Sequence, residues 1–169
     1  MRSTTMLKWL TRIAIGAVAL GALTTSASAS NGDDERAVAG VRQATAAFHD
    51  LDKATAANYQ KLLPCFDLPG VGGMGQHYVD TSRLDAIIEP NRPEALVYEV
   101  DGDRLHLVAV EYIVPWVAWD STTPPQLYGR SFFSVASLHL WALHAWIWRP
   151  NPLGMFANYN PNVKLCPGH

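Results

Sequence analysis

The stretch Glu94-Ala-Leu-Val-Tyr-Glu-Val-Asp-Gly-Asp-Arg-Leu-His-Leu-Val-Ala-Val-Glu-Tyr-Ile-Val114 predicts a β-hairpin, and it is the clearest structural signal in the chain. Two runs rich in β-branched and aromatic residues flank Asp101-Gly102, a dipeptide that favours the positive φ angles of a two-residue type I′ turn. With these residues as the turn, Glu99 lies opposite Arg104 and forms a cross-strand ion pair.

The same register places Glu111 on the face of the second strand that also carries Leu105, Leu107 and Ala109. We expect this face to be buried. A carboxylate there needs a partner, because an unpaired charge is costly away from water.

Residues 35–63, before the hairpin, predict one amphipathic helix. The segment is rich in Ala, contains no Gly or Pro after Gly40, and is ended by Pro64. Residues at steps of three and four define the helix face that we expect to be buried, namely Val38, Val41, Ala44, Phe48, Leu51, Thr55, Tyr59 and Leu62.

Residues 138–148, after the hairpin, predict a long strand on which His144, Trp146 and Trp148 share a face. A helix over residues 135–143 is the alternative. A helix followed by a hairpin and a further strand is the order of an α+β domain. We expect one N-terminal amphipathic helix packed on a curved antiparallel sheet or a partly open barrel.

The N-terminus predicts export. Three basic residues flank the start of an apolar run over residues 13–23, and Ala27-Ser28-Ala29 matches the small-residue pattern that signal peptidase cleaves. We predict a secretory signal peptide over residues 1–29 and a single globular domain over residues 30–169, secreted or periplasmic. An uncleaved anchor is the alternative, but the apolar run is shorter than the roughly 18 residues of a membrane-spanning helix.

The charge balance argues against polyanionic partners. The chain has 13 basic and 15 acidic residues, and the predicted signal peptide contains Arg2, Lys8 and Arg12 but no acidic residue. The mature domain is therefore acidic and lacks the basic surface that nucleic acid requires. We also expect no membrane association after signal cleavage, and the sequence leaves the oligomeric state open.

Two cysteines, Cys65 and Cys166, lie in the predicted mature domain. A lone pair in an oxidising compartment is expected to form a disulfide, which would tie the end of the chain to the segment after the helix. Free thiols or metal thiolates are the alternative.

Histidine and glutamate supply the first candidate site. The 6 histidines form no compact metal motif, so the fold has to assemble any site. The candidate ligands are His77, which follows a glycine-rich run, Glu111 and His144. Two imidazoles and one carboxylate suit a divalent transition metal such as zinc, copper or iron and leave coordination positions open. The alternative is that each imidazole is packed and hydrogen-bonded in the core.

The second hypothesis is a metal-free binding protein with a pocket for a small apolar ligand. The chain has 6 Trp, and such pockets are lined by aromatic side chains with a few polar groups. The candidate residues are Tyr78, Trp146 and Trp148. The alternative is that these side chains belong to the core.

Several motifs span most of the mature chain. Besides the two cysteines they comprise Gly73-Met-Gly-Gln-His-Tyr78, Pro93-Glu-Ala-Leu-Val-Tyr-Glu99, Val110-Glu-Tyr112 and His144-Ala-Trp-Ile-Trp148 with Asn151-Pro152. Together they resemble a family of small secreted bacterial proteins of unknown function. The resemblance implies export and a single domain, and it implies no activity, substrate or cofactor. Its motifs include His77, Glu111 and His144, which groups these residues as one hypothesis. Whether the protein is an enzyme stays open at this point.

Overall fold

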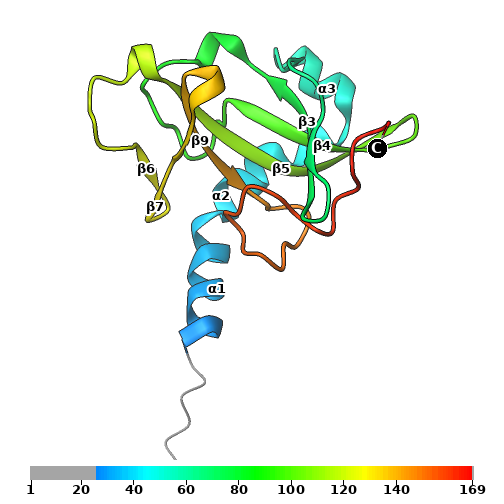
Figure 1. The fold of residues 1–169 in the computed structure, drawn as a ribbon, viewed down its shortest axis with the longest axis horizontal. Coiled ribbons are helices and arrows are strands. Elements are labelled where there is room, and N and C mark those ends of the chain that lie inside the picture. Colours follow the sequence, from blue (N-terminus) through cyan, green and yellow to red (C-terminus); the bar gives the residue numbers. More distant parts are fainter. Residues whose placement is uncertain (1–25, 169) are drawn as a thin grey trace, which may run out of the picture.

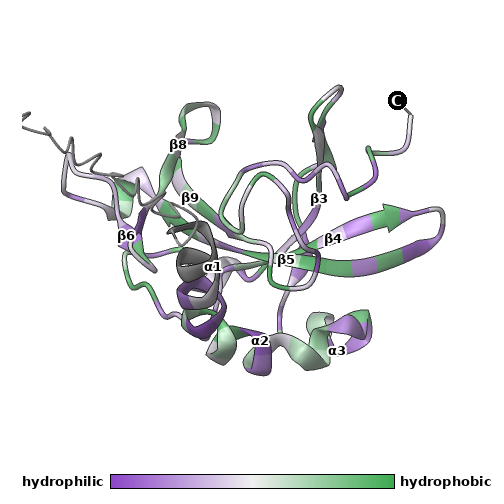
Figure 2. Cartoon of the chain, turned by 90° about the horizontal axis from the view of Figure 1, so that it is seen from below, coloured by the Kyte–Doolittle hydropathy of each residue, from purple (hydrophilic) through white to green (hydrophobic). Residues whose placement is uncertain are grey.

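The computed structural model describes residues 26–168, in which an antiparallel sheet has short helices on one side (Figures 1 and 2). The predicted signal peptide lies mostly outside the described residues, and helix α1 (Ser26–Ala37) begins before the predicted cleavage point. Within residues 26–168, no helix has the length and apolar character needed to cross a membrane.

Seven strands form the main sheet, and every pairing in it is antiparallel. The strand order is β1 (Gln60–Lys61), β3 (Gly72–Val79), β4 (Ala95–Asp101), β5 (Arg104–Pro115), β9 (Leu140–Ala145) and β8 (Phe133–Val135), with β2 (Phe66–Leu68) paired to the start of β3. Strands β6 (Gln126–Leu127) and β7 (Arg130–Ser131) pair separately. The sheet does not close. The predicted α+β class and antiparallel sheet are therefore confirmed, and the sheet is open.

The single helix predicted over residues 35–63 is wrong, because the segment is divided into α1, α2 (Ala39–Thr45), the 3-10 turn η1 (Ala46–His49) and α3 (Leu51–Ala56). At the end of α2, Thr45 Oγ1 donates to the carbonyl of Val41 at 2.8 Å, a bond that bends helices. Asp50 is extended, and its carboxylate accepts from the amide of Asp52 at 3.1 Å, so it caps a new helix.

Helix α3 ends well before Pro64. Asn58 has a left-handed φ of 73°, and the amide of Tyr59 donates to the carbonyl of Ala54 at 3.1 Å, as in a Schellman motif. Tyr59 therefore lies beyond the helix, where it is buried in the core, and Leu62 is exposed. Val38 and Val41 are buried in the same cluster, together with Tyr98 and Tyr112 of the sheet.

The hairpin of β4 and β5 is present, but its predicted register is wrong. Asp101 pairs with Arg104, so the turn is Gly102-Asp103, and Gly102 takes a φ of 60° at the first central position, as a type II′ turn requires. Glu99 lies opposite His106 and makes its ion pair with Arg149 instead of Arg104.

A β-bulge in β5 decides which way Glu111 points. Val97 pairs with Ala109 but Tyr98 pairs with Leu107, so one extra residue interrupts the alternation. Leu107 consequently faces the helices with Val110 and Tyr112, and Ala109 and Glu111 face the other side. The prediction that Glu111 shares a face with Leu107 is therefore wrong.

The C-terminal segment runs along the glycine-rich start of β3. The amide of Asn160 donates to the carbonyl of Gly73 at 2.9 Å, and the amide of Gly73 donates to the carbonyl of Val163 at 3.2 Å. A Cβ atom on Gly73 would lie 2.4 Å from the carbonyl oxygen of Lys164, so this position needs glycine for close approach. The predicted disulfide Cys65–Cys166 is confirmed and anchors the end of this segment.

The strand predicted over residues 138–148 is shorter, because β9 spans only Leu140–Ala145 and follows a 3-10 turn, η4 (Ala136–Leu138). The chain turns after Ala145, and the amides of Trp148 and Arg149 both donate to the carbonyl of Val108 at the bulge. Trp148 packs against His49 on the helical side, with ring centroids 4.5 Å apart. It therefore does not share the face of His144.

Close packing at Gly73 makes a testable prediction. We expect Gly73→Ala to lower the free energy of unfolding by about 2–3 kcal/mol, because the new methyl group displaces the C-terminal segment. The control is Gly70→Ala, where nothing lies within 4 Å and only the left-handed φ of 84° adds a cost, of about 1 kcal/mol. Urea unfolding with the disulfide intact measures both, and a smaller loss at Gly73 than at Gly70 would contradict the packing.

Candidate metal centre

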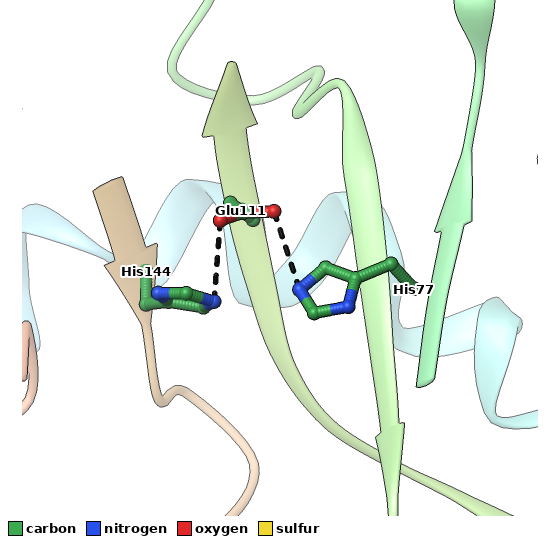
Figure 3. A group of neighbouring side chains, drawn as sticks. All are labelled: His77, Glu111 and His144. Carbon is green, nitrogen blue, oxygen red and sulfur yellow. Dashed lines mark ion pairs between the residues drawn. The ribbon is translucent and has the colours of Figure 1, made fainter. Parts of the chain in front are cut away.

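The structure brings His77, Glu111 and His144 together from three strands (Figure 3). Glu111 on β5 and His144 on β9 are direct cross-strand partners. His77 lies on β3 and reaches Glu111 across β4, where the residue opposite Glu111 is Ala95.

The two imidazoles approach the carboxylate from opposite sides. His77 Nε2 lies 3.3 Å from Glu111 Oε2, and His144 Nε2 lies 3.2 Å from Glu111 Oε1. One ligand atom from each residue falls within 4.8 Å of the other two. All three side chains are buried, with His144 fully inaccessible to solvent.

Burial shifts all three groups towards their neutral forms. Burial, with a smaller contribution from the charge of nearby Glu94, raises the pKa of Glu111 to about 8. Burial also lowers the pKa of His77 to about 4. It lowers the pKa of His144 as well, with a further contribution from His77. In the metal-free protein these directions favour a protonated Glu111 between two neutral imidazoles.

The imidazole nitrogens lack satisfactory hydrogen bonds. Among the described residues, no partner with hydrogen-bond geometry reaches Nδ1 of His77 or either ring nitrogen of His144. Buried polar groups are nearly always satisfied, so three unsatisfied nitrogens in one cluster call for an explanation. A metal ion bound through the two Nε2 atoms would account for Nε2 of His144 and would leave both Nδ1 atoms without a partner.

Aromatic packing orients both rings, and the backbone of Gly75 also interacts with the ring of His77. His144 is stacked between Phe133 and Trp146, at centroid distances of 5.7 Å and 5.9 Å. His77 meets the ring of Phe66 edge-on at 5.8 Å. Metal-binding histidines usually donate their second nitrogen to a protein acceptor, and Nδ1 of His144 has no such acceptor among the described residues.

The three residues predicted to line an apolar pocket are not brought together. Tyr78 is buried in the core on the helical side, where its ring packs against Tyr98. Trp146 and Trp148 line a cavity of about 400 Å³, whose wall includes Asp34, Glu35 and Arg42. Trp146 serves the histidine cluster as a stacking partner, and its indole N–H donates to the carbonyl of Ala157.

A different and mostly apolar cavity adjoins the cluster. It has a volume of about 380 Å³, and His77, Glu111 and His144 contribute to its wall. The sequence analysis missed its aromatic residues Phe66 and Phe133, which lie in short strands with no alternation that could identify them. His49, His106 and His139 are exposed and lie outside the cluster.

No protein-family model, curated protein or solved structure matches this chain. The suspected family therefore stays a prediction, and the function has to be argued from the chemistry of the cluster.

The burial of the cluster predicts its protonation state. In protein stripped of metal by a chelator, His77 and His144 should both be neutral at pH 5.5, because burial lowers their pKa values below the ordinary 6.5. Nitrogen-15 NMR of the imidazole rings measures this directly, with His77→Gln and His144→Gln for assignment. An imidazolium signal from either residue at pH 5.5 would contradict the account.

Proposed function

We propose that this protein is an exported metal-binding protein that holds a divalent transition metal through His77 Nε2, Glu111 and His144 Nε2. The observation that carries the proposal is the convergence of three buried ligand atoms within 4.8 Å, on strands far apart in the sequence. The structure contains a disulfide, which supports an oxidising compartment outside the cytoplasm, either secreted or periplasmic.

The spacing of the ligand atoms suits a metal ion. Nitrogen and oxygen ligands lie about 2.0–2.2 Å from zinc, so two of them on a tetrahedral ion are about 3.3–3.5 Å apart. The nitrogen–oxygen separations of 3.3 Å and 3.2 Å in the cluster are close to this value. These separations involve different carboxylate oxygens, and the three ligand atoms lie within 4.8 Å of one another, so a metal ion would either bind both oxygens or draw the side chains together.

The charge balance of the cluster also favours a metal ion. A buried carboxylate beside two imidazoles has to be neutralised by a proton or by a cation. A divalent ion replaces the proton on Glu111 and accepts the free lone pairs of both Nε2 atoms, and binding should release that proton.

The donor set leaves at least one coordination position open. Catalytic zinc sites use three protein ligands and a water, and two histidines with one carboxylate also hold iron in oxygenases. Zinc, copper or iron therefore suit the site. An ion with an open position polarises an oxygen of a bound molecule, which makes a metal-dependent enzyme one form that this function can take.

The proposal predicts the metal content of the protein. The chain expressed with its N-terminal segment in an exporting host should contain nearly one metal ion per molecule by elemental analysis, or take up one on titration with zinc, copper or ferrous iron. His77→Ala with His144→Ala should remove it. The matched control is His106→Ala, which alters an exposed histidine outside the cluster and should keep the metal. A folded parent that takes up none of the three ions would refute the proposal.

The variant Glu111→Gln tests whether Glu111 binds metal or only stabilises the fold. The amide has nearly the same shape but no charge to desolvate, so the metal-free variant should be at least as stable at pH 8 as the metal-free parent. Zinc should raise the melting temperature of the parent and leave that of Glu111→Gln unchanged, since only the parent binds it. Differential scanning calorimetry measures both, and equal stabilisation of the two proteins by zinc would rule out Glu111 as a ligand.

A further inference from the structure

The cavity beside the cluster indicates what kind of molecule would reach the metal. Its volume of about 380 Å³ is within the usual range for small-molecule sites, which runs from about 300 to 1,000 Å³. Most of its wall is apolar, with side chains from both sides of the cluster: Leu63, Phe66, Met74, Phe133, Leu138 and Leu140.

The polar part of the wall is small and carries no further charge. Besides the three cluster residues, the polar side chains are Ser134, Ser137, Asn158 and Tyr159. Among the residues that the structure describes, no Lys or Arg lines the cavity. A ligand with two negative charges, such as a phosphate or a dicarboxylate, would therefore keep one charge without a partner, and a sugar would find too few hydrogen-bonding groups.

The charge of the metal-bound cluster indicates which chemical group of a ligand would bind the metal. Two neutral imidazoles and one carboxylate leave a divalent ion with a net charge near +1. A single anionic oxygen donor neutralises this charge and occupies the open coordination position.

The conformation and exposure of Leu63 concern the apolar part of the ligand. Leu63 has a left-handed φ of 68°, a conformation that is unfavourable for a residue other than glycine. The carbonyl of Leu63 accepts from Gln76 Nε2 at 2.9 Å, which holds it there, and its side chain lines the cavity while 39% exposed. Leu138 also lines the cavity and is 41% exposed. Two partly exposed leucines therefore lie at the cavity, where an apolar ligand could contact both.

We propose that the cavity takes a small molecule with an apolar body and one anionic oxygen head group, and that the head group coordinates the metal. This inference rests on the proposed metal site, since the metal supplies the charge that the head group meets. The body lies against the wall formed by Leu63, Phe66, Phe133 and Leu138.

Alkyl hydroxamates test the inference, because each presents one anionic oxygen-donor head on an apolar tail. The full chain is loaded with Co²⁺, and acetohydroxamate, butyrohydroxamate and hexanohydroxamate are titrated while the visible spectrum of the ion is followed. Each buried methylene should tighten binding by about fourfold, so hexanohydroxamate should bind about 100-fold or more tightly than acetohydroxamate. Cobalt content after dialysis controls for removal of the ion.

Variants at the cavity sharpen the test. Leu63→Asp and Leu138→Asp each place a carboxylate beside the apolar tail at a partly exposed position, so the fold should tolerate them. Both should weaken hexanohydroxamate at least about 10-fold and reduce the dependence on tail length. The matched control is Leu62→Asp, since Leu62 is 40% exposed and does not line the cavity. This variant should bind the series as the parent does.

The outcomes separate the two proposals. A chain that binds no Co²⁺ would overturn the metal site and this inference with it. Co²⁺ bound with no spectral response to any hydroxamate, or with equal affinity for short and long tails, would overturn this inference and leave the metal site standing. Tail selectivity that is unchanged in Leu63→Asp and Leu138→Asp would also overturn it.

Discussion

The cost of burying a carboxylate between two imidazoles is the constraint on which the rest of the structure depends. Glu111 is almost inaccessible, and its two oxygens each face an Nε2 atom at close to 3 Å. Such a group is tolerated in a protein interior only when a proton or a cation neutralises it. The cluster is thus either a neutral network that holds one proton or a metal site, and Nε2 of His144, which has no hydrogen-bond partner among the described residues, favours the second.

Several features of the fold position the side chains of this cluster. A bulge in β5 turns Glu111 away from the helical core and towards His144 and His77. Stacking between Phe133 and Trp146 fixes the ring of His144. The glycine run before His77 admits the C-terminal segment at close range, and the disulfide anchors that segment. Asn158 and Tyr159 of the same segment then contribute to the cavity wall, so the end of the chain helps to shape the site.

The sequence predicted the residues of the cluster better than it predicted the elements that carry them. The metal-ligand chemistry of histidine and glutamate selected His77, Glu111 and His144. The expected export to an oxidising compartment predicted the disulfide Cys65–Cys166. Both sets of residues come together in the structure. The hairpin was predicted but not its register, because Asp101-Gly102 and Gly102-Asp103 are both plausible turns and a bulge leaves no mark in the apolar pattern. The helix break at Asp50 depends on a local cap that competes with Ala-rich periodicity. The aromatic pocket was misplaced because Trp148 follows a turn set by the bulge at Val108, a contact between distant segments.

X-ray absorption spectroscopy of the zinc-loaded protein tests the central claim most directly, since it reports which atoms surround the ion. The account predicts a first shell of nitrogen and oxygen at about 2.0–2.2 Å, with the outer scattering of two imidazole rings. The imidazole scattering should fall to that of one ring in His144→Ala. A first shell without imidazole, or a spectrum unchanged by that substitution, would place the ion elsewhere and contradict the account.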